Sequence, residues 1–344
     1  MFGPESTTAE IFSTVVQPLV PWACAGGVGT LFAYGQTGSG KTYTVSGLEK
    51  HVAEALMGGS YDGERKMYIS IVELTGKTAC GKLHPSSYYR EFQTHIMIPQ
   101  DLLNDREKIS ILEDSFGNTQ MVGAAEHEIT NKDALLEWID TAAALRRTEP
   151  TKRNDTSSRS HSICRIRIVN TDPPTTEDGL LYLVDLAGSE SARDKDLHDA
   201  ARMREASDIN TSLSVLKDCI RGRAMLDADA LAGKSSAKKA YVPFRQSALT
   251  KMLKHVFDPT SVRSCKTVVV ACVNPCAADV PAGKNTLRYA EMLSVVIPRA
   301  DALKYDPLVP GSWDNEQVRE WIEKNVGIIF PSIDETEHRS LNSG

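Results

Sequence analysis

Long apolar runs are missing from this sequence of 344 residues. No stretch of about 18 consecutive apolar residues occurs, and the N-terminal residues 1–6 contain no basic region followed by an apolar segment. We therefore expect neither a membrane span nor a signal peptide. Internal repeats and long low-complexity tracts are missing as well, which argues against a fibrous or repeat architecture.

Paired cysteines and surplus positive charge are also missing. The seven cysteines are scattered without a Cys-x-x-Cys pair, which favours reduced thiols inside a cell over a disulfide framework or a zinc site. The net charge is −6, so a chain that coats nucleic acid is not expected, and an acidic partner would have to meet local basic patches. The 41% apolar and 24% charged residues are typical of a globular protein.

Short apolar runs separated by helical periodicity predict an α/β fold of either two average domains or one large domain. Strands are expected at residues 29–34, 67–74, 163–169, 180–184 and 267–273, and helices at 41–57, 204–223 and 249–256. A further helix is expected to start at Thr130, whose hydroxyl would cap it while Asp133 completes a capping box. The polar segment 226–240 is expected to be a loop.

The composition changes after Pro298, where prolines surround a short amphipathic stretch at 313–326. We therefore predict one domain at residues 1–298 and a separate unit or linker at 299–344. The stretch faintly resembles the first helix of a sterile-alpha-motif domain, but an amphipathic packing helix is the favoured interpretation.

A glycine-rich segment that follows a predicted strand and precedes a predicted helix matches the pattern G-x-x-x-x-G-K-[ST]. Its glycines allow backbone N–H groups to wrap around phosphates, while Lys41 would reach the β- and γ-phosphates and the Thr42 hydroxyl would hold Mg²⁺. The segment consists of Gly35, Gln36, Thr37, Gly38, Ser39, Gly40, Lys41 and Thr42. This context predicts a nucleoside triphosphate site.

Two more segments indicate which class of triphosphate-binding protein this is. Residues 154–161, Asn-Asp-Thr-Ser-Ser-Arg-Ser-His, precede a strand, and residues 185–190, Asp-Leu-Ala-Gly-Ser-Glu, follow one. An acid at a strand end can hold Mg²⁺ through water, and a nearby glycine can turn its amide toward a γ-phosphate. Alone, each segment could be an ordinary solvated turn or strand exit. Their occurrence together with the phosphate loop favours the functional interpretation.

In this order, the three segments resemble the phosphate loop, switch I and switch II of the kinesin motor domain. Residues 241–250, Tyr-Val-Pro-Phe-Arg-Gln-Ser-Ala-Leu-Thr, and 285–290, Asn-Thr-Leu-Arg-Tyr-Ala, resemble two further kinesin signatures. The resemblance covers residues 2–297. It implies a P-loop NTPase with a central, mostly parallel eight-stranded sheet flanked by helices, ATP as substrate with Mg²⁺, and tubulin or microtubules as partner. It further implies a location at the microtubule cytoskeleton of the cytoplasm, spindle or axoneme, without nucleic-acid or membrane binding.

The resemblance also implies roles for individual residues. Thr42 and Ser158 would hold Mg²⁺ directly and Asp185 through water, while Gly188 would sense the γ-phosphate. Arg159 and Glu190 would pair when the switches close, with Asn154 and Ser157 beside the γ-phosphate, and Tyr43 would stack on the base.

One helix points to a particular type of kinesin. Lys217-Asp218-Cys219 followed by Ile220-Arg221 resembles a Lys-Glu-Cys triplet on the tubulin-facing helix of the kinesin-thirteen, microtubule-depolymerising family, with Asp in place of Glu. An ordinary exposed basic helix face is the alternative. The tubulin contacts expected from the resemblance are Lys217, Arg221, Arg223, Lys234, Lys238, Lys239 and Arg245.

The sequence departs from the kinesin pattern in three places. One is the Lys-Val-Asp loop tip that the family associates with depolymerisation, which is expected to be missing together with the first strand. An Arg-x-Arg-Pro segment, which lies against the adenine in kinesins, is missing near the N-terminus, so the first strand is expected to be missing too. Ala248 stands where the family usually has a lysine. Three hypotheses follow: a motor ATPase that depolymerises microtubules or moves along them, a non-catalytic tubulin-binding scaffold, and another P-loop enzyme, which the switch segments disfavour.

Overall fold

The structure is a computed structural model that describes residues 1–59, 61, 63–75, 97–115, 117–147, 159–172, 177–189, 200–231, 241–258, 263, 265–293 and 315–326. The chain divides into two compact units, Met1–Val295 and Val296–Gly344. In the second unit the described residues form the helix α9 (Asn315–Val326). The predicted boundary after residue 298 and the linker role of residues 299–344 stay predictions. Among the described residues, no helix is both long and apolar enough to cross a bilayer.

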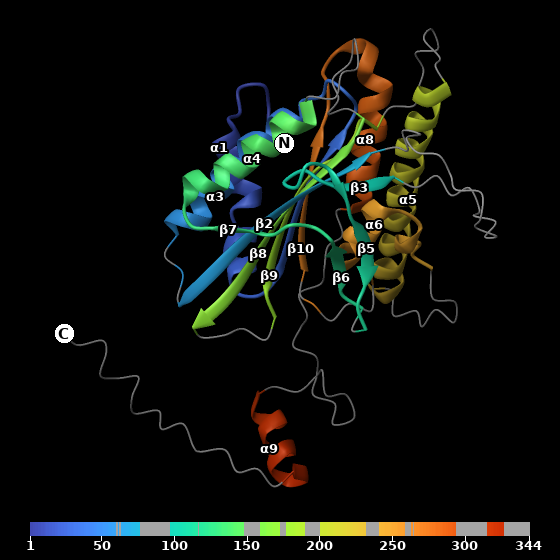
Figure 1. Ribbon diagram of the computed structural model, residues 1–344. Coiled ribbons are helices and arrows are strands. Elements are labelled where there is room, and N and C mark those ends of the chain that lie inside the picture. Colours follow the sequence, from blue (N-terminus) through green and yellow to red (C-terminus); the bar gives the residue numbers. More distant parts are fainter. Residues whose placement is uncertain are drawn as a thin grey trace, which may run out of the picture. The chain divides into compact units, whose positions relative to one another are not determined.

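A central sheet organises the first unit (Figure 1). Strand β1 (Val28–Gly35) lies second from one edge of the sheet. It pairs in parallel with the edge strand β10 (Cys265–Cys272) on one side and with β9 (Gly179–Asp185) on the other. The sheet continues through β8 (His161–Asp172), β2 (Glu64–Thr75), β3 (Ile98–Asp101) and β4 (Glu107–Lys108), and β7 (His127–Ile129) also pairs with β2. A separate hairpin consists of β5 (Ser110–Glu113) and β6 (Thr119–Val122).

The described residues form an eight-stranded sheet. The absence of the family's first strand stays a prediction, and the expectation that the sheet is mostly parallel is wrong. Within the described part of the sheet, only the two pairings of β1 are parallel, and the remaining pairings are antiparallel. One cause is chain length: only residues 173–178 connect β8 to β9, whereas a parallel neighbour needs a crossover of roughly a dozen residues. A short connection therefore forces β8 and β9 to run in opposite directions.

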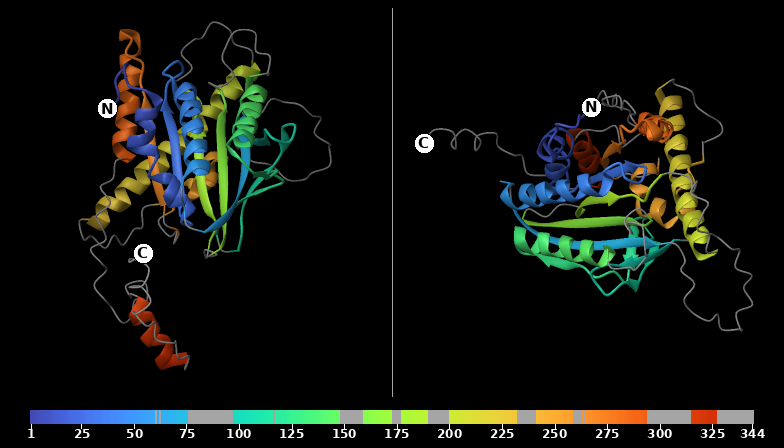
Figure 2. Two further views of the ribbon diagram at one scale, coloured as in Figure 1. Left: turned by 90° about the vertical axis from the view of Figure 1, so that its left-hand side faces the viewer. Right: turned by 90° about the horizontal axis from the view of Figure 1, so that it is seen from above.

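Helices cover both faces of the sheet (Figures 1 and 2). One face carries α1 (Thr8–Ile11), the π-helix η1 (Phe12–Val16), α2 (Leu19–Cys24), α3 (Lys41–Gly58) and α4 (Lys132–Arg147). The other carries α5 (Ala200–Leu231), the 3₁₀ turn η3 (Phe244–Gln246), α6 (Ala248–Met252), α7 (Lys254–Phe257) and α8 (Val280–Leu293), which follows the turn η4 (Ala277–Asp279). Successive residues of β1 pack into the hydrophobic cores on opposite faces of the sheet. Leu31 packs into the core beneath α3, and Phe32 packs into the core beneath α5. This double burial explains why β1 is apolar on both faces.

Several predicted helix ends differ from the structure. Helix α4 is capped by Asn131 rather than Thr130, since the Asn131 side chain accepts a hydrogen bond from the Ala134 N–H at 2.8 Å. Helix α5 continues to Leu231, so the predicted loop is wrong at residues 226–231, where Leu and Ala residues favour a helix. The rest of that loop lies outside the described residues. The helix predicted at 249–256 is divided at Leu253 into α6 and α7.

Candidate nucleotide site and basic helix face

The predicted phosphate loop connects the end of β1 to the start of α3, as the motif requires. Gly38 and Gly40 adopt φ angles of 76° and 86°, in the left-handed region that favours glycine. At Gly35, a Cβ atom would lie 2.1 Å from the Cys272 carbonyl oxygen, so β10 leaves no space for a side chain. The strand, loop and helix predicted from the sequence are therefore confirmed.

The Lys41 ammonium group lies inside this loop. Its Nζ donates a hydrogen bond to the Gln36 carbonyl oxygen at 2.8 Å, and the side chain is buried. The Ser39 hydroxyl donates to the same carbonyl at 2.7 Å. The ammonium therefore lies at the N-terminus of α3, where the helix dipole also favours an anion. Tyr43, in the first turn of α3, is exposed, and its contact with a base stays a prediction.

Thr42, at the end of the phosphate loop, contacts Asp185. The Thr42 hydroxyl donates a hydrogen bond to Asp185 Oδ2 at 2.8 Å. Asp185 is the last residue of β9 and is buried, and its Oδ1 atom has no hydrogen-bond partner among the described residues. A hydroxyl and an incompletely bonded carboxylate are the hard oxygen donors that Mg²⁺ prefers. These two residues therefore fit a magnesium ion, whereas the third predicted ligand, Ser158, lies outside the described residues.

Arg146 is a site residue that the sequence analysis missed. It comes from the last turn of α4, and its Nη1 donates to Asp185 Oδ2 at 2.6 Å while its Nη2 donates to the Ser160 carbonyl at 2.7 Å. The Ser160 hydroxyl in turn donates to Glu73 Oε1 at 2.6 Å, and Arg106 pairs with Glu73 Oε2 at 2.6 Å. Buried carboxylates from β2 and β9 are thus neutralised by arginines. An arginine in the last turn of a predicted helix gives no signal of this role in the sequence.

His161 links the site to α5. Its Nδ1 accepts a hydrogen bond from the Ala187 N–H at 3.0 Å, so its Nε2 carries the proton and donates to the Ser212 hydroxyl at 2.8 Å. Burial, and then the charges of Arg146 and Lys41, lower the pKa of His161 to about 3. His161 is therefore neutral at physiological pH and joins β8, the segment after β9, and α5.

The segment that follows Asp185 contacts the phosphate loop. The Ser189 N–H donates to the Gly35 carbonyl at 3.0 Å, and the preceding Gly188 is buried. This arrangement brings the predicted γ-phosphate sensor to the start of the loop. Arg159 is partly buried. Asn154, Ser157, Ser158 and Glu190 lie outside the described residues, so their roles stay predictions.

The predicted tubulin contacts do not form one uniform surface. Lys217 and Arg221 both lie against Tyr289 of α8, whereas Arg223 directs Nη1 toward the Asp258 carbonyl at 3.5 Å. Ile209, Leu213, Leu216 and Ile220, which recur at helical spacing along α5, are buried. Lys234, Lys238 and Lys239 lie outside the described residues.

Arg245 lies on η3, where an acidic residue of the same chain binds it. Its Nε and Nη2 donate to the two carboxylate oxygens of Glu113 at 2.8 and 2.9 Å, and Lys254 Nζ contacts Glu113 Oε2 at 2.9 Å. The hydrogen bond from Arg245 is the main reason that the pKa of Glu113 is lowered to about 2, and Lys254 adds to it. Arg245 is still mostly exposed, so a partner could reach it.

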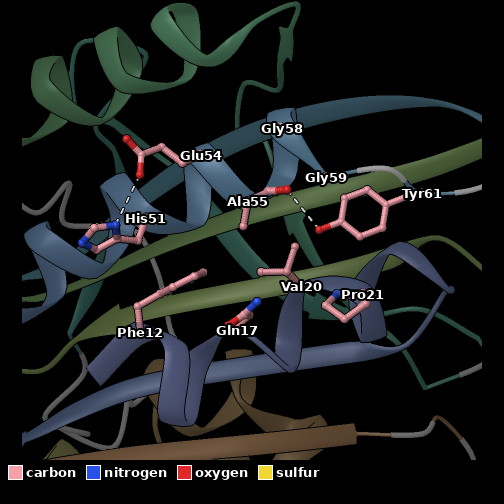
Figure 3. A pocket seen from close by; sticks show the side chains of 10 residues that line it. All are labelled: Phe12, Gln17, Val20, Pro21, His51, Glu54, Ala55, Gly58, Gly59 and Tyr61. Carbon is pink, nitrogen blue, oxygen red and sulfur yellow. Dashed lines mark hydrogen bonds and ion pairs between the residues drawn. The ribbon is translucent and has the colours of Figure 1, made fainter. Parts of the chain in front are cut away.

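A pocket of about 500 Å³ lies at the opposite end of α3 from the phosphate loop (Figure 3). Phe12, Val20 and Pro21 from the N-terminal helices face His51 and Ala55 of α3 across it. The Tyr61 hydroxyl closes one end by donating to the Ala55 carbonyl at 3.0 Å. Since none of the predicted phosphate or Mg²⁺ ligands lines this pocket, it is separate from the candidate nucleotide site.

The fold and the loop define a P-loop nucleotide-binding protein. A kinesin motor domain model matches residues 1–296, and the chain belongs to this family. It is 37% identical over 293 residues to the diatom spindle kinesin-1 of Cylindrotheca fusiformis, covering 85% of this chain and 41% of that protein. It is 31% identical over 352 aligned positions to the kinesin-like protein KIN-13B of Arabidopsis thaliana, covering 93% of this chain and 46% of that protein.

The solved structures include a similar kinesin, described as a fast kinesin with implications for its ATPase mechanism and its interactions with microtubules. The two chains superimpose with a TM-score of 0.65 at 26% sequence identity, over 84% of this chain and 76% of the other. The chain spans less than half the length of the two curated relatives named above.

Proposed function

We propose that this chain is an ATP-hydrolysing motor domain that works on microtubules. The observation that carries the proposal is the contact between the phosphate loop and β9. Lys41 lies buried within the loop, and the next residue, Thr42, contacts the carboxylate of Asp185 at 2.8 Å. Phosphoryl transfer needs this combination of a cation and metal-binding oxygens more than it needs a covalent nucleophile.

Each part of the site has a defined task in this proposal. The backbone N–H groups of the loop and the Lys41 ammonium bind the phosphates, with Lys41 leaving the Gln36 carbonyl for the stronger anionic acceptor. Thr42 and Ser158 would hold Mg²⁺ directly and Asp185 through water, and the bound ion would neutralise charge on the phosphate oxygens. Arg146 fixes the Asp185 carboxylate through its 2.6 Å contact and so keeps the acid aligned with Thr42.

The water that attacks the γ-phosphate is positioned by the two switch segments. Gly188 directs its amide to the γ-phosphate, and Arg159 pairs with Glu190 when the segments close. Asn154 and Ser157 are the residues that would assist beside the same phosphate. The Ser189 contact with Gly35 supports this proposal because it places the second segment against the phosphate loop.

Tubulin is the proposed partner of the basic helix face. Lys217 and Arg221 on α5 and Arg245 on η3 offer cations to an acidic surface, and the lysines at 234, 238 and 239 would add screened contacts. The Lys217-Asp218-Cys219 triplet and the similarity to KIN-13B support microtubule depolymerisation as the finer assignment. Stepping along microtubules is the alternative, because membership of the kinesin motor domain family is compatible with either activity.

Stabilised microtubules incubated with the protein and ATP separate these activities. Shortening from the ends would support depolymerisation, and gliding without shortening would refute it in favour of stepping. Microtubule binding that is the same with ATP, ADP and no nucleotide, without turnover, would instead identify a non-catalytic scaffold. No binding to microtubules in any nucleotide state would overturn the proposal.

A further inference from the structure

Two cations of α5 lie against one aromatic ring of the same chain. Lys217 and Arg221 occupy successive turns of α5, next to α8 (Figure 1). The Lys217 Nζ is 4.6 Å and the Arg221 Cζ 5.3 Å from the centre of the Tyr289 ring. Arg221 Nη2 also donates a hydrogen bond to the Tyr289 hydroxyl at 2.9 Å. Tyr289 therefore binds both cations, by cation–π attraction and by one hydrogen bond.

This arrangement places like charges close together. Burial and then the Arg221 charge lower the pKa of Lys217, so each cation makes the other less favourable. Asp218 compensates part of this charge through its 3.2 Å contact with Arg221. The cluster retains an excess positive charge, which an acidic partner would stabilise by drawing the two side chains away from the ring.

Tyr289 also contacts the strand that leads into the phosphate loop. The rings of Tyr289 and Tyr34 meet edge to face, with centroids 6.3 Å apart and an angle of 74° between their planes. Tyr34 is buried and directly precedes Gly35. Burial raises the pKa of Tyr34 to about 12, although a hydrogen bond with the Ser189 side chain acts to lower this pKa. Ser189 also donates its N–H to the Gly35 carbonyl at 3.0 Å.

A continuous set of contacts thus runs from the α5 cations through Tyr289 and Tyr34 to Ser189 and Gly35. We propose that Tyr289 is a positioning residue that couples the charge state of this α5 face to nucleotide affinity at the phosphate loop. An acidic partner that removes Lys217 and Arg221 from the ring frees Tyr289 to shift, and the shift reaches Gly35 through Tyr34. The proposal rests on the proposed nucleotide site but not on the identity of the partner.

The coupling can be measured without a partner, through the dissociation constant of fluorescently labelled ADP. Lys217→Gln together with Arg221→Gln mimics removal of the cations, and we expect it to change the dissociation constant about fivefold or more, the lower limit of typical coupling between sites. In a Tyr289→Leu background the same double substitution should change it less than twofold. Tyr289→Phe keeps the ring and should retain most of the effect.

Two further variants make the test specific. Tyr34→Phe keeps the contact between the rings but loses the hydroxyl that bonds Ser189, so the effect of the double substitution should shrink even if Tyr289→Leu does not fold. Tyr68→Leu is the matched control, because it removes a similar cation–π contact, with Arg167 at 4.6 Å, from β2. The effect should persist in this control.

An equal fold-change in the wild-type, Tyr289→Leu and Tyr34→Phe backgrounds would overturn the coupling, because a purely structural role of Tyr289 predicts that result. Nucleotide binding by the wild-type chain would then still support the proposed function. If the folded wild-type chain does not bind ADP or ATP, both proposals are wrong.

Discussion

Arg146 neutralises buried acids from two different strands. Its guanidinium is 2.6 Å from Asp185 and 3.7 Å from Glu73, and all three side chains are almost fully buried. Removal of one partner from such a cluster leaves an uncompensated charge in a region of low dielectric constant. The arginine is thus needed for the stability of the domain as well as for the alignment of Asp185.

We predict that Arg146→Leu lowers the free energy of unfolding by about 3–5 kcal/mol, the usual cost of breaking a buried ion pair. Urea unfolding followed by circular dichroism measures this change. Lys132→Leu, at the exposed start of the same helix, is the control and should stay within about 0.5 kcal/mol of the wild type. A loss below about 1 kcal/mol for Arg146→Leu would show that the cluster does not depend on this charge.

Lys41 is the main side-chain cation of the phosphate loop. We predict that Lys41→Ala weakens ATP binding roughly 10- to 100-fold, because the loop loses a charge-assisted hydrogen bond of about 1.5–3 kcal/mol to the phosphates. Turnover should fall below detection. Lys50→Ala, exposed on the same helix, should bind ATP like the wild type in the same titration. Unchanged ATP affinity and turnover in Lys41→Ala would refute this assignment.

At the scale of elements, His255 attaches α7 to the sheet. Its ring stacks on Tyr182 of β9 with centroids 4.7 Å apart, and its Nε2 lies 2.7 Å from the Thr30 hydroxyl on β1. Burial, followed by the charge of Arg263, lowers the pKa of His255 from 6.5 to about 3. Between about pH 6.5 and pH 3, His255 is therefore protonated in the unfolded chain but neutral in the folded chain.

This difference predicts a stability that falls as the pH falls from 6.5 toward 3. Between pH 7 and 5 the wild type should lose about 1–2 kcal/mol more unfolding free energy than His255→Gln, since one pKa unit corresponds to about 1.4 kcal/mol. The variant retains His161, so the comparison isolates His255. Parallel curves of unfolding free energy against pH for the two proteins, measured by urea unfolding at each pH, would contradict a neutral, partly buried His255.

The hairpin β5–β6 is attached to η3 and α7 by Glu113. Because Arg245 and Lys254 lower the pKa of this carboxylate from 4.5 to about 2, its contribution to stability is complete above about pH 4.5 and is lost as the pH falls toward 2. We predict that Glu113→Gln melts at a lower temperature than the wild type at pH 6 and that the difference narrows by pH 3.

The exposed Glu107→Gln on β4 is the control for this prediction and should melt like the wild type at both pH values. Because Arg245 is mostly exposed, added salt should also narrow the difference at pH 6. A difference between Glu113→Gln and the wild type that is the same at pH 6 and pH 3 would contradict a charged Glu113.

Contiguous motifs made part of this site predictable from the sequence. Glycines, Lys41 and Thr42 lie within one loop, so their spacing alone predicts a strand, a phosphate loop and a helix. The pairs Arg146–Asp185 and Arg245–Glu113 could not be predicted, because their partners are 39 and 132 residues apart and only the fold brings them together. Helix ends were predicted less well, since Thr130 and Asn131 are both suitable caps.

At the scale of the whole first unit, the sheet separates two kinds of surface. Gly35 and Asp185 are the last residues of the parallel strands β1 and β9. They therefore lie at the carboxyl ends of these strands, where ligands bind in open α/β sheets. The α5 cations Lys217 and Arg221 lie on the face of the sheet that α5 and α8 cover, against Tyr289 of α8. Two of the side-chain contacts between these regions are the hydrogen bond of His161 with Ser212 and the ring contact of Tyr289 with Tyr34. Such contacts would allow microtubule binding to alter turnover at the nucleotide site.

The most direct test of this account is the steady-state rate of ATP hydrolysis with and without microtubules, at low and fixed ionic strength. We predict that the wild-type chain hydrolyses ATP slowly alone and faster as microtubules are added, and that Lys41→Ala shows no turnover in either case. A correctly folded wild-type chain that hydrolyses no ATP, with microtubules at saturating concentration, would contradict the central claim.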